Sequence, residues 1–396
     1  MPINAYWVTV VEVRWYSLDG SCLPLFITPI FILFCLALIN LILHKVAPKS
    51  AFTQSEMLVI YIMIVIGETL CGHDFVQNLF GVVGHPFRFA TPENKWEELF
   101  HHYLPTWLVV TDETALTGFY EGASVWWHRE NLLPMIGPLG WWGLWLAVLI
   151  TVLMCLNVII RRPWTEHEKL AFPLIVLPLE MTKGQESGQF FRNRLMWIGF
   201  GVALAIDLVN GLHAFFPHVP ELKYIKQYNL RQHLTGMPWD HMGRFTTSMY
   251  PFAIGLAFFL PTDLSFSCWF FYLFSKLEML AGGMIGMRQA QGLPYLNEQA
   301  GGAWLALAVS GLWAARAHLT SVWSAVIGKG DRLSDYDEPF SYRFAVLGLV
   351  LGSALLVVFG VQAGMNSPTI VAFLVIFYLL SLAMTRVRAE FGAPHE

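Results

Sequence analysis

Charged side chains are scarce in this sequence, since aspartate, glutamate, lysine and arginine together account for only 13% of its 396 residues. Hydrophobic residues account for 56%, and the mean hydropathy of +0.52 is too high for an ordinary soluble domain. The net charge of −4 also leaves the chain without the basic surface that binds nucleic acid. The composition therefore predicts a polytopic membrane protein whose main partner is the lipid bilayer, with no nucleic acid partner.

Signatures of metal, nucleophilic and phosphate chemistry are also absent from the sequence. The five cysteines form no CxxC and no Cys/His ligand spacing, so we interpret them as packing residues. The stretch EHEKL is not a zinc-binding HExxH, and there is neither a GxSxG nucleophile motif nor a phosphate-binding loop. The sequence thus predicts no catalytic residue, no metal and no cofactor, and it favours a protein that is not an enzyme.

Long apolar runs are abundant by contrast, and about 20 apolar residues are enough for a helix to cross the hydrocarbon core of a bilayer. The runs lack the short alternating pattern of a membrane β-barrel, so we expect an all-α bundle forming a single transmembrane domain over residues 1–396. Nine spans are predicted: Leu23–Leu43, Glu56–Cys71, Pro138–Ile160, Leu195–Phe215, Met249–Leu260, Leu264–Gly286, Ala303–Ile327, Phe344–Val361 and Thr369–Met384.

Lysine and arginine orient the predicted spans, because cytoplasmic loops hold the excess of basic residues. The loop His73–Gly137 holds three basic residues against eight acidic ones, so we expect it to be an external insertion. The loop Arg161–Arg194 is rich in arginine and lysine and is expected to be cytoplasmic. With nine spans, the N-terminus lies outside the cell membrane and the C-terminus in the cytoplasm. The basic residues of Glu221–Thr247, also assigned outside, argue against this orientation.

A carboxylate interrupts the apolar stretch FFLPTDLSFSCWFF, in which Pro261 marks a break between two spans. In one interpretation PTDLS is a cytoplasmic turn, and Asp263 caps the following helix. In the other it is an unwound segment inside the bundle, where Thr262, Asp263, Ser265 and Ser267 offer oxygens to a cation, a proton or a substrate. The sequence leaves both interpretations open.

Seven further polar side chains lie in or near predicted spans, where a charge costs at least about 2.5 kcal/mol. They are Glu68, Asp207, Asn210, Lys276, Glu278, Arg316 and His318. Lys276 and Glu278 are two residues apart and do not face each other on a helix, so each needs a partner elsewhere. Any one of these side chains fits a structural ion pair or a satisfied histidine better than a functional role. Together they are too many for packing alone, and they are candidate binding residues for a substrate or an ion.

A short apolar stretch in EHEKLAFPLIVLPLEM is interrupted by Pro173 and Pro178. It is too short to span a bilayer, so we expect a kinked segment packed at the cytoplasmic end of the bundle.

Four stretches together resemble an uncharacterised family of bacterial multi-pass membrane proteins: ENKWEELFHHYLPTWLVV, TEHEKLAFPLIVLPLEM, LPTDLSFSCWFF and TRVRAEFGAPHE. The resemblance covers most of the chain and implies a bacterial inner-membrane protein. This family is in turn loosely similar to the oligopeptide-transporter superfamily, although no residue role carries over. Proteins that it resembles extend beyond both ends, so we expect the chain to be a fragment.

The combination of intramembrane charge, a broken span and no nucleotide site favours a secondary transporter. Its acidic side chains would take up protons or cations together with a small polar or peptide-like solute. One alternative is a membrane-embedded enzyme that uses the carboxylates and histidines of the outer loop on a lipid-linked substrate. Another is a non-catalytic subunit of a membrane assembly. The essential acids would lie in the spans of a transporter and in the outer loop of an enzyme.

Overall fold

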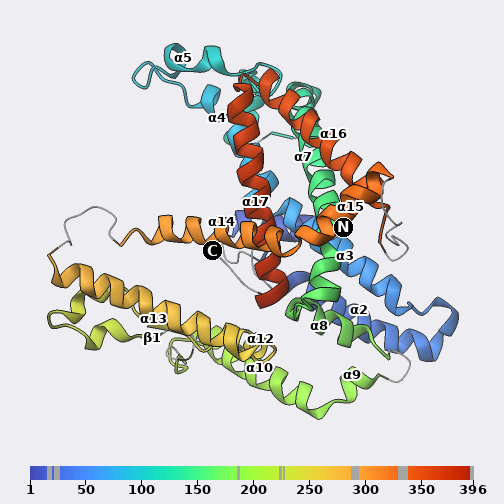
Figure 1. Cartoon of the computed structure of the whole chain (residues 1–396), viewed down its shortest axis with the longest axis vertical. Coiled ribbons are helices and arrows are strands. Elements are labelled where there is room, and N and C mark those ends of the chain that lie inside the picture. Colours follow the sequence, from blue (N-terminus) through green and yellow to red (C-terminus); the bar gives the residue numbers. More distant parts are fainter. Residues whose placement is uncertain are drawn as a thin grey trace.

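The computed structural model describes residues 1–15, 20–21, 27–122, 124–125, 127–184, 188–222, 225, 228–286, 294–328 and 338–392, without the side chains of His73 and Asp74 (Figure 1). Helices dominate this part of the chain. Its only sheet is an antiparallel pair of two-residue strands, β1 (Tyr228–Asn229) and β2 (Thr246–Thr247). The prediction of an all-α protein is confirmed.

The helices follow one another along the chain as α1 (Pro2–Thr9), η1 (Val10–Arg14), α2 (Ile27–Val46), η2 (Pro48–Ser50), α3 (Gln54–Cys71), η3 (His73–Gln77), α4 (Asn78–Arg88), α5 (Trp96–Leu99), η4 (His101–Tyr103), α6 (Glu113–Tyr120), α7 (Arg129–Arg162), η5 (Pro163–His167), α8 (Pro173–Thr182), α9 (Gln189–Arg192), α10 (Arg194–Phe215), η6 (Leu230–His233), η7 (Trp239–Met242), α12 (Pro251–Phe258), α13 (Thr262–Met284), α14 (Leu296–Ala314), α15 (Arg316–Ile327), α16 (Tyr342–Gln362) and α17 (Ser367–Phe391). Here η1, η3 and η5 are π-helical turns, and the other η elements are 3₁₀-helical. Local capping begins several of the α-helices. Thr53 and Glu56 form a capping box at α3, and the Asp112 carboxylate accepts the Ala115 amide at α6.

Six helical segments of the described chain are long and apolar enough to cross a membrane. They are α2, α3 continued by η3 and α4, α7 continued by η5, α10, α16 and α17. The predicted count of nine spans is therefore not confirmed. The start of the first predicted span, Leu23, lies outside the described residues.

The three remaining predicted spans differ from single long apolar helices, each for its own reason. Met249–Leu260 contains only the eight-residue α12. Leu264–Gly286 largely coincides with α13, whose 23 residues are long enough, but its polar and charged side chains keep it out of the apolar set. Ala303–Ile327 is divided at Ala315, where α14 ends and α15 begins. Neither glycine nor proline occupies that break, so the sequence contains no local signal for it.

The break at Pro261 and the short length of the stretch with paired prolines are confirmed, whereas the cytoplasmic position of that stretch stays a prediction. The break at Pro261 is real, because α12 ends at Phe258 and α13 begins at Thr262. The stretch with paired prolines forms only the 10-residue α8, which at about 1.5 Å per residue is too short to cross a bilayer. This helix packs against α2, α3 and α17.

The predicted outer loop contains helices, because α3 ends at Cys71, Gly72 is extended, and η3 and α4 then carry helical structure to Arg88. The helices α4 and α6 then pack against the start of α7 around Val83, Ala115, Leu116 and Met135. Figure 1 shows α4 and α5 at one end of the molecule's long axis. The segment thus forms a small cap with its own apolar core.

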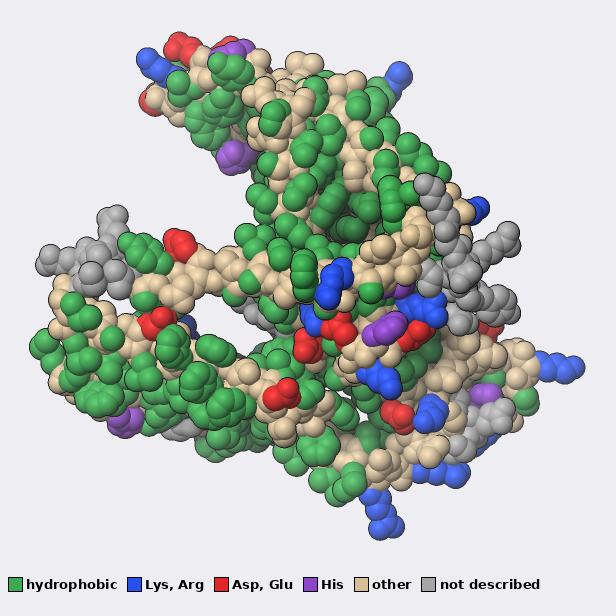
Figure 2. All heavy atoms as spheres, viewed as in Figure 1, with side chains coloured by type: hydrophobic (Ala, Val, Ile, Leu, Met, Phe, Trp, Pro, Cys, Tyr) green, Lys and Arg blue, Asp and Glu red, His purple; other side chains and the backbone are tan. Residues whose placement is uncertain are grey.

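The long helices run in two directions (Figure 1). The helices α7 and α17 run along the long axis, whereas α10, α13 and α14 run across it. None of the residues of α10 or α12 is buried. Figure 2 shows apolar side chains covering the face where α10 and α13 lie, and positive and negative side chains grouped near α15 and the end of α17.

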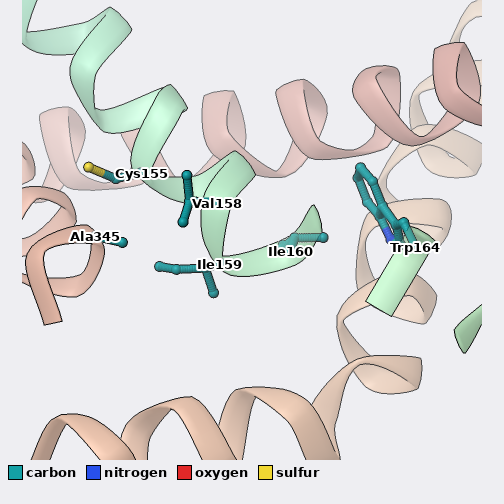
Figure 3. Packing of buried hydrophobic residues seen from close by; sticks show 6 residues of the cluster. All are labelled: Cys155, Val158, Ile159, Ile160, Trp164 and Ala345. Carbon is teal, nitrogen blue, oxygen red and sulfur yellow. The ribbon is translucent and has the colours of Figure 1, made fainter. Parts of the chain in front are cut away.

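The main core lies where α7 meets α16 and α17. Figure 3 shows Cys155, Val158 and Ile159 of α7 beside Ala345 of α16. A Cβ atom at Gly348 would lie 2.7 Å from the Cys155 sulfur, so the missing side chain lets the two helices approach closely. Gly352 makes the same kind of close approach to Val152. Small residues on one face of α16 therefore create the tightest helix contact in this core.

Candidate functional site

The carboxylate of Asp263 occupies neither of the two arrangements predicted for it. Residues Thr262 to Met284 are helical, so PTDLS is not an unwound segment, and the N-cap position belongs to Pro261 with no side-chain cap. Asp263 and Thr262 are exposed in the first turn of α13, while Ser265 and Ser267 are half-buried. The Ser267 hydroxyl donates to the Asp263 carbonyl at 2.9 Å.

Lys276 and Glu278 of α13 face different neighbours, as their spacing predicts. The Lys276 ammonium is buried, donates to the Arg244 carbonyl at 2.6 Å, and lies 5.4 Å from the centre of the Tyr272 ring. The Glu278 carboxylate accepts a hydrogen bond from Gln299 of α14 at 3.5 Å. Both side chains therefore contact neighbouring segments of the chain, Lys276 the backbone at Arg244 and Glu278 the helix α14.

The other predicted residues also have local structural roles. Asp207 is exposed on α10, and the Asn210 side chain accepts the Leu222 amide at 2.8 Å. Arg316 is exposed over the Trp313 ring and donates to the Trp313 carbonyl. His318 is half-buried and donates from Nε2 to the Ile159 carbonyl at 3.0 Å, joining α15 to the end of α7.

Glu68 differs from all of these residues, because its side chain is completely buried. It lies in the last turn of α3, where α1 packs against that helix. Asn4 of α1 donates from Nδ2 to Glu68 Oε2 at 3.4 Å, and the side chain of Thr28 of α2 lies near the Glu68 carboxylate. Within the described chain, Glu68 Oε1 and Asn4 Oδ1 have no hydrogen-bond partner. Three helices thus converge on a carboxylate that lacks a cationic neighbour among the described residues.

A second buried carboxylate, Glu12 of η1, lies beside this group with an exposed fraction of only 2%. It accepts hydrogen bonds from the Ser21 amide at 2.6 Å and from the Ser21 hydroxyl at 2.9 Å. Gly72, one turn beyond Glu68, makes this packing possible, because a Cβ there would lie 3.2 Å from Glu12 Oε2 and would overlap Ser21. Two negative groups therefore share one small buried region at the end of α3.

The segment around these carboxylates is held by further polar contacts. Gln77 of η3 donates to the Thr9 hydroxyl at 2.9 Å and to the Cys71 carbonyl at 3.2 Å. These bonds join α1 to the turn that follows α3. The N-terminal helix is thereby fixed across the buried end of α3.

Carboxylates at the ends of α7, α16 and α17 differ from Glu68, because they are paired with arginine. Three arginine–glutamate pairs connect this region: Arg161–Glu338, Arg162–Glu166 and Arg386–Glu168. The Glu338 side chain is 2% exposed, yet it receives the Arg161 guanidinium at 2.9 Å and the Tyr342 hydroxyl at 3.2 Å. A buried acid in this region is fully partnered, whereas Glu68 is not.

Histidines and acids of the cap serve its internal structure. His101 Nε2 donates to the Pro86 carbonyl at 2.9 Å, and the His85 ring packs on Phe89. Burial raises the pKa of the phenol of Tyr120, which donates to the Gly81 carbonyl. No group of three or more His, Cys, Asp or Glu side chains suited to a metal ion occurs in the described part of the chain.

A large apolar groove lies elsewhere, among α2, α8, α9, α10 and α12. Its volume is about 540 Å³, within the range of about 300–1,000 Å³ that is typical of ligand pockets. All the side chains that line it are apolar, among them Phe34, Met181, Phe200 and Phe252. Its described lining contains no polar group that would orient a polar solute.

Sequence reasoning identified Glu68 but missed Asn4, Glu12 and Ser21. None of the predicted site residues lies before Glu68 in the chain. The sequence did indicate that these residues matter, because Asn4 and Glu12 lie in a mostly apolar run. An amide and a carboxylate in such a run indicate a polar contact in the interior.

Within the described residues, the fold and this site define a helical protein with six segments able to span a membrane and a buried carboxylate, Glu68, one of whose oxygens has no hydrogen-bond partner. The chain belongs to a family of unknown function, DUF6785, whose family model matches residues 1–396. No curated protein and no solved structure matches the chain. The expected uncharacterised family is confirmed, and the similarity to oligopeptide transporters stays an expectation that these comparisons do not support.

Proposed function

We propose that the protein is a secondary transporter that moves a small polar or peptide-like solute across a membrane, coupled to protons or cations. The observation that carries this proposal is the complete burial of Glu68 with one carboxylate oxygen unpartnered in the described chain. Removing an ionised carboxylate from water is costly unless a cation or a proton accompanies it. A site of this kind can bind and release a coupling ion.

Two interrupted helices also support transport. The chain breaks between α12 and α13 and again between α14 and α15. Discontinuous helices are frequent in secondary transporters, where they allow one part of a bundle to move against another. The acids at the ends of α7, α16 and α17 are paired with arginine. They therefore fit a part of the bundle that stays fixed better than a site that binds a coupling ion.

The proposed location is the inner membrane of a bacterium, with the cap of residues 73–137 outside and the segment Arg161–Arg194 in the cytoplasm. Its support is the charge balance of the two segments. Single cysteines placed at Glu97 and Lys183 test it in intact cells with a membrane-impermeant maleimide. Labelling is expected at position 97 alone, and labelling at position 183 alone would reverse the topology.

Flux measurements in proteoliposomes test the function. Wild-type protein is expected to accumulate radiolabelled dipeptides or amino acids when a proton or sodium gradient is imposed, and Glu68→Gln is expected to abolish the gradient dependence. Asp263→Asn is the matched control, because it removes the same charge from an exposed position. Gradient-driven flux that survives in correctly inserted Glu68→Gln protein would reject the role of this site. The enzyme alternative instead predicts loss of activity on substitution of cap acids such as Glu97.

A further inference from the structure

The apolar groove beside α2 and α10 lies between two helices that are able to cross a membrane. Its volume of about 540 Å³ and its apolar described lining suit a hydrocarbon chain better than a polar solute. Three of the aromatic side chains that line it, Phe31, Phe200 and Phe252, are 63%, 46% and 48% exposed. The groove is therefore open from the side, where the hydrocarbon core of a bilayer would meet it.

The groove follows the first half of α2. Near one end, Phe34 of α2 stacks on Phe200 of α10 with ring centroids 6.2 Å apart, and its centroid lies 5.5 Å from that of Phe191 of α9. The lining extends along α2 as far as Ile27. At about 1.5 Å per residue, Ile27 lies about 10 Å from Phe34 along the helix axis. The groove thus has the shape of a slot that holds part of one acyl chain.

Two arginines lie at the Phe34 end of this slot. Arg192 ends α9 and Arg194 begins α10, and the same two helices contribute the lining residues Phe190 and Met196. Both arginine side chains are exposed, and neither forms an ion pair with a described residue. This end of the groove therefore carries positive charge that the described chain does not neutralise.

The charged end of the groove lies toward the basic end of α2. Gly188, just before α9, lies so close to α2 that a Cβ there would be 3.3 Å from Leu41, and Lys45 follows in the last turn of that helix. Figure 1 shows α9 and α10 at the end of the long axis opposite α4 and α5. Glu180 of α8 is paired with Lys183 at 3.5 Å, so it does not neutralise the arginines. Positive charge at a helix end and an apolar slot further in match the headgroup and the chain of a phospholipid.

We propose that the groove binds an anionic phospholipid, with one acyl chain between α2 and α10 and the phosphate on Arg192 and Arg194. Guanidinium groups bind phosphate oxygens through paired N–H donors. A zwitterionic lipid carries no net charge, so these arginines attract it less. None of the residues of α10 is buried, and the acyl chain supplies apolar contacts that join this helix to α2. The site does not depend on whether the protein moves a solute.

Thermal unfolding of the purified, delipidated full chain in detergent tests the headgroup. We expect dioleoylphosphatidylglycerol to raise the Tm saturably, and dioleoylphosphatidylcholine, which has the same chains, to raise it much less. The double variant Arg192→Gln, Arg194→Gln is expected to raise the half-saturating concentration of phosphatidylglycerol by about 30-fold, the effect of two basic residues on an anionic lipid. The control variant Lys95→Gln, Arg129→Gln removes two exposed cations from the cap and is expected to keep the wild-type response.

A larger side chain in the groove tests the position of the acyl chain. Ile30 lines the groove, so Ile30→Trp is expected to fill it and to abolish the response to phosphatidylglycerol. Ile39→Trp is the matched control, because Ile39 is 53% exposed on the same helix and lies outside the lining. If Ile30→Trp does not fold, wild-type protein carries the test with one equivalent of phosphatidylglycerol that has a diazirine in its acyl chain. Photolabelling is expected within Ile27–Phe34 and Met196–Phe200 rather than on α16.

Several outcomes would overturn the proposal. Equal Tm increases with the two lipids would show that the charge of the headgroup is not recognised. An unchanged response to phosphatidylglycerol in the double arginine variant would remove the phosphate from this end of the groove. Photolabel spread evenly over α10 and α16 would indicate ordinary contact with bulk lipid. Absence of label from the groove, together with a disulfide between two chains of Phe31→Cys protein, would assign the groove to a second copy of the chain.

Discussion

The helices α16 and α10 are nearly equal in length, with 21 and 22 residues, and both are apolar enough to cross a membrane. Their surroundings differ sharply, because α16 packs tightly on α7 while α10 has no buried residue. The surroundings of the glycines in each helix explain this difference in packing. Gly352 of α16 faces Val152 at close range, whereas no atom lies within 4 Å of a Cβ built at Gly199, Gly201 or Gly211 of α10. The hydropathy of a helix thus decides whether it can lie in a membrane. The positions of its small residues decide which other helix it packs against.

Polar side chains also differ between the tightly packed region of α7 and α16 and the region of α10 and α13. The buried acid near the ends of α7 and α16, Glu338, is paired with Arg161. In the region of α13, the buried Lys276 instead relies on a backbone carbonyl and an aromatic ring. The first region resembles a rigid scaffold, and the second is held by few contacts.

The largest expected effect separates two leucines of these helices. Leu356→Ala in α16 is expected to cost about 2–5 kcal/mol, because Leu356 is 1% exposed and packs with Leu149, Ile370 and Leu374. Leu204→Ala in α10 is the matched control, since Leu204 is 50% exposed, and the expected change is within about 0.5 kcal/mol. Thermal unfolding in detergent measures both. Equal losses would show that α10 is packed as tightly as α16.

A second comparison uses the glycines. Gly352→Leu is expected to cost about 1–3 kcal/mol, because the new side chain would collide with Val152 and force α7 and α16 apart. Gly201→Leu places the same side chain in open space and is expected to be neutral or slightly stabilising, since leucine favours the helix. Unfolding temperatures of the two variants give the answer. A stable Gly352→Leu protein would contradict the close contact.

A smaller, local effect is expected at Lys276. Replacement by methionine keeps the length of the side chain but leaves the Arg244 carbonyl without its donor, at a cost of about 1 kcal/mol. Hydrogen exchange is expected to increase in η7 and its neighbours, which pack on α13, and to stay unchanged in α16. Lys183→Met is the control, because that side chain is 65% exposed. Unchanged exchange near Arg244 would mean that Lys276 does not hold this segment.

The smallest effect is expected for Asp263→Asn. Asp263 is exposed in the first turn of α13, and its carboxylate makes no hydrogen bond or ion pair with the described residues, so losing its interaction with the helix dipole is expected to change the stability within about 0.5 kcal/mol. Thr53→Ala provides the contrast, because it removes a true capping box at α3 and is expected to cost about 1 kcal/mol. Helix stability followed by circular dichroism compares them. A loss of stability well above about 0.5 kcal/mol for Asp263→Asn would show that this carboxylate makes contacts in the interior.

Part of the candidate site could be predicted from the sequence and part could not. Glu68 was recognisable as a carboxylate within an apolar run, because burial of charge is improbable without a reason. Asp263 met the same criterion, yet the structure leaves it exposed at the start of a helix. The pattern identifies a charge in an apolar segment but does not show which face of the helix is covered.

The sequence by itself determined the helical class, the apolar cores of the six candidate spans, the break at Pro261 and the short length of α8. These features follow from local physics, namely the hydrogen bonding of the backbone, the length of apolar runs and the missing amide of proline. Only the tertiary structure decided the break at Ala315, the helical structure of η3 and α4 beyond Gly72, and the meeting of Asn4 with Glu68. Asn4 and Glu68 are separated by 64 residues, and their contact depends on the packing of α1 against α3, which no short stretch of sequence encodes.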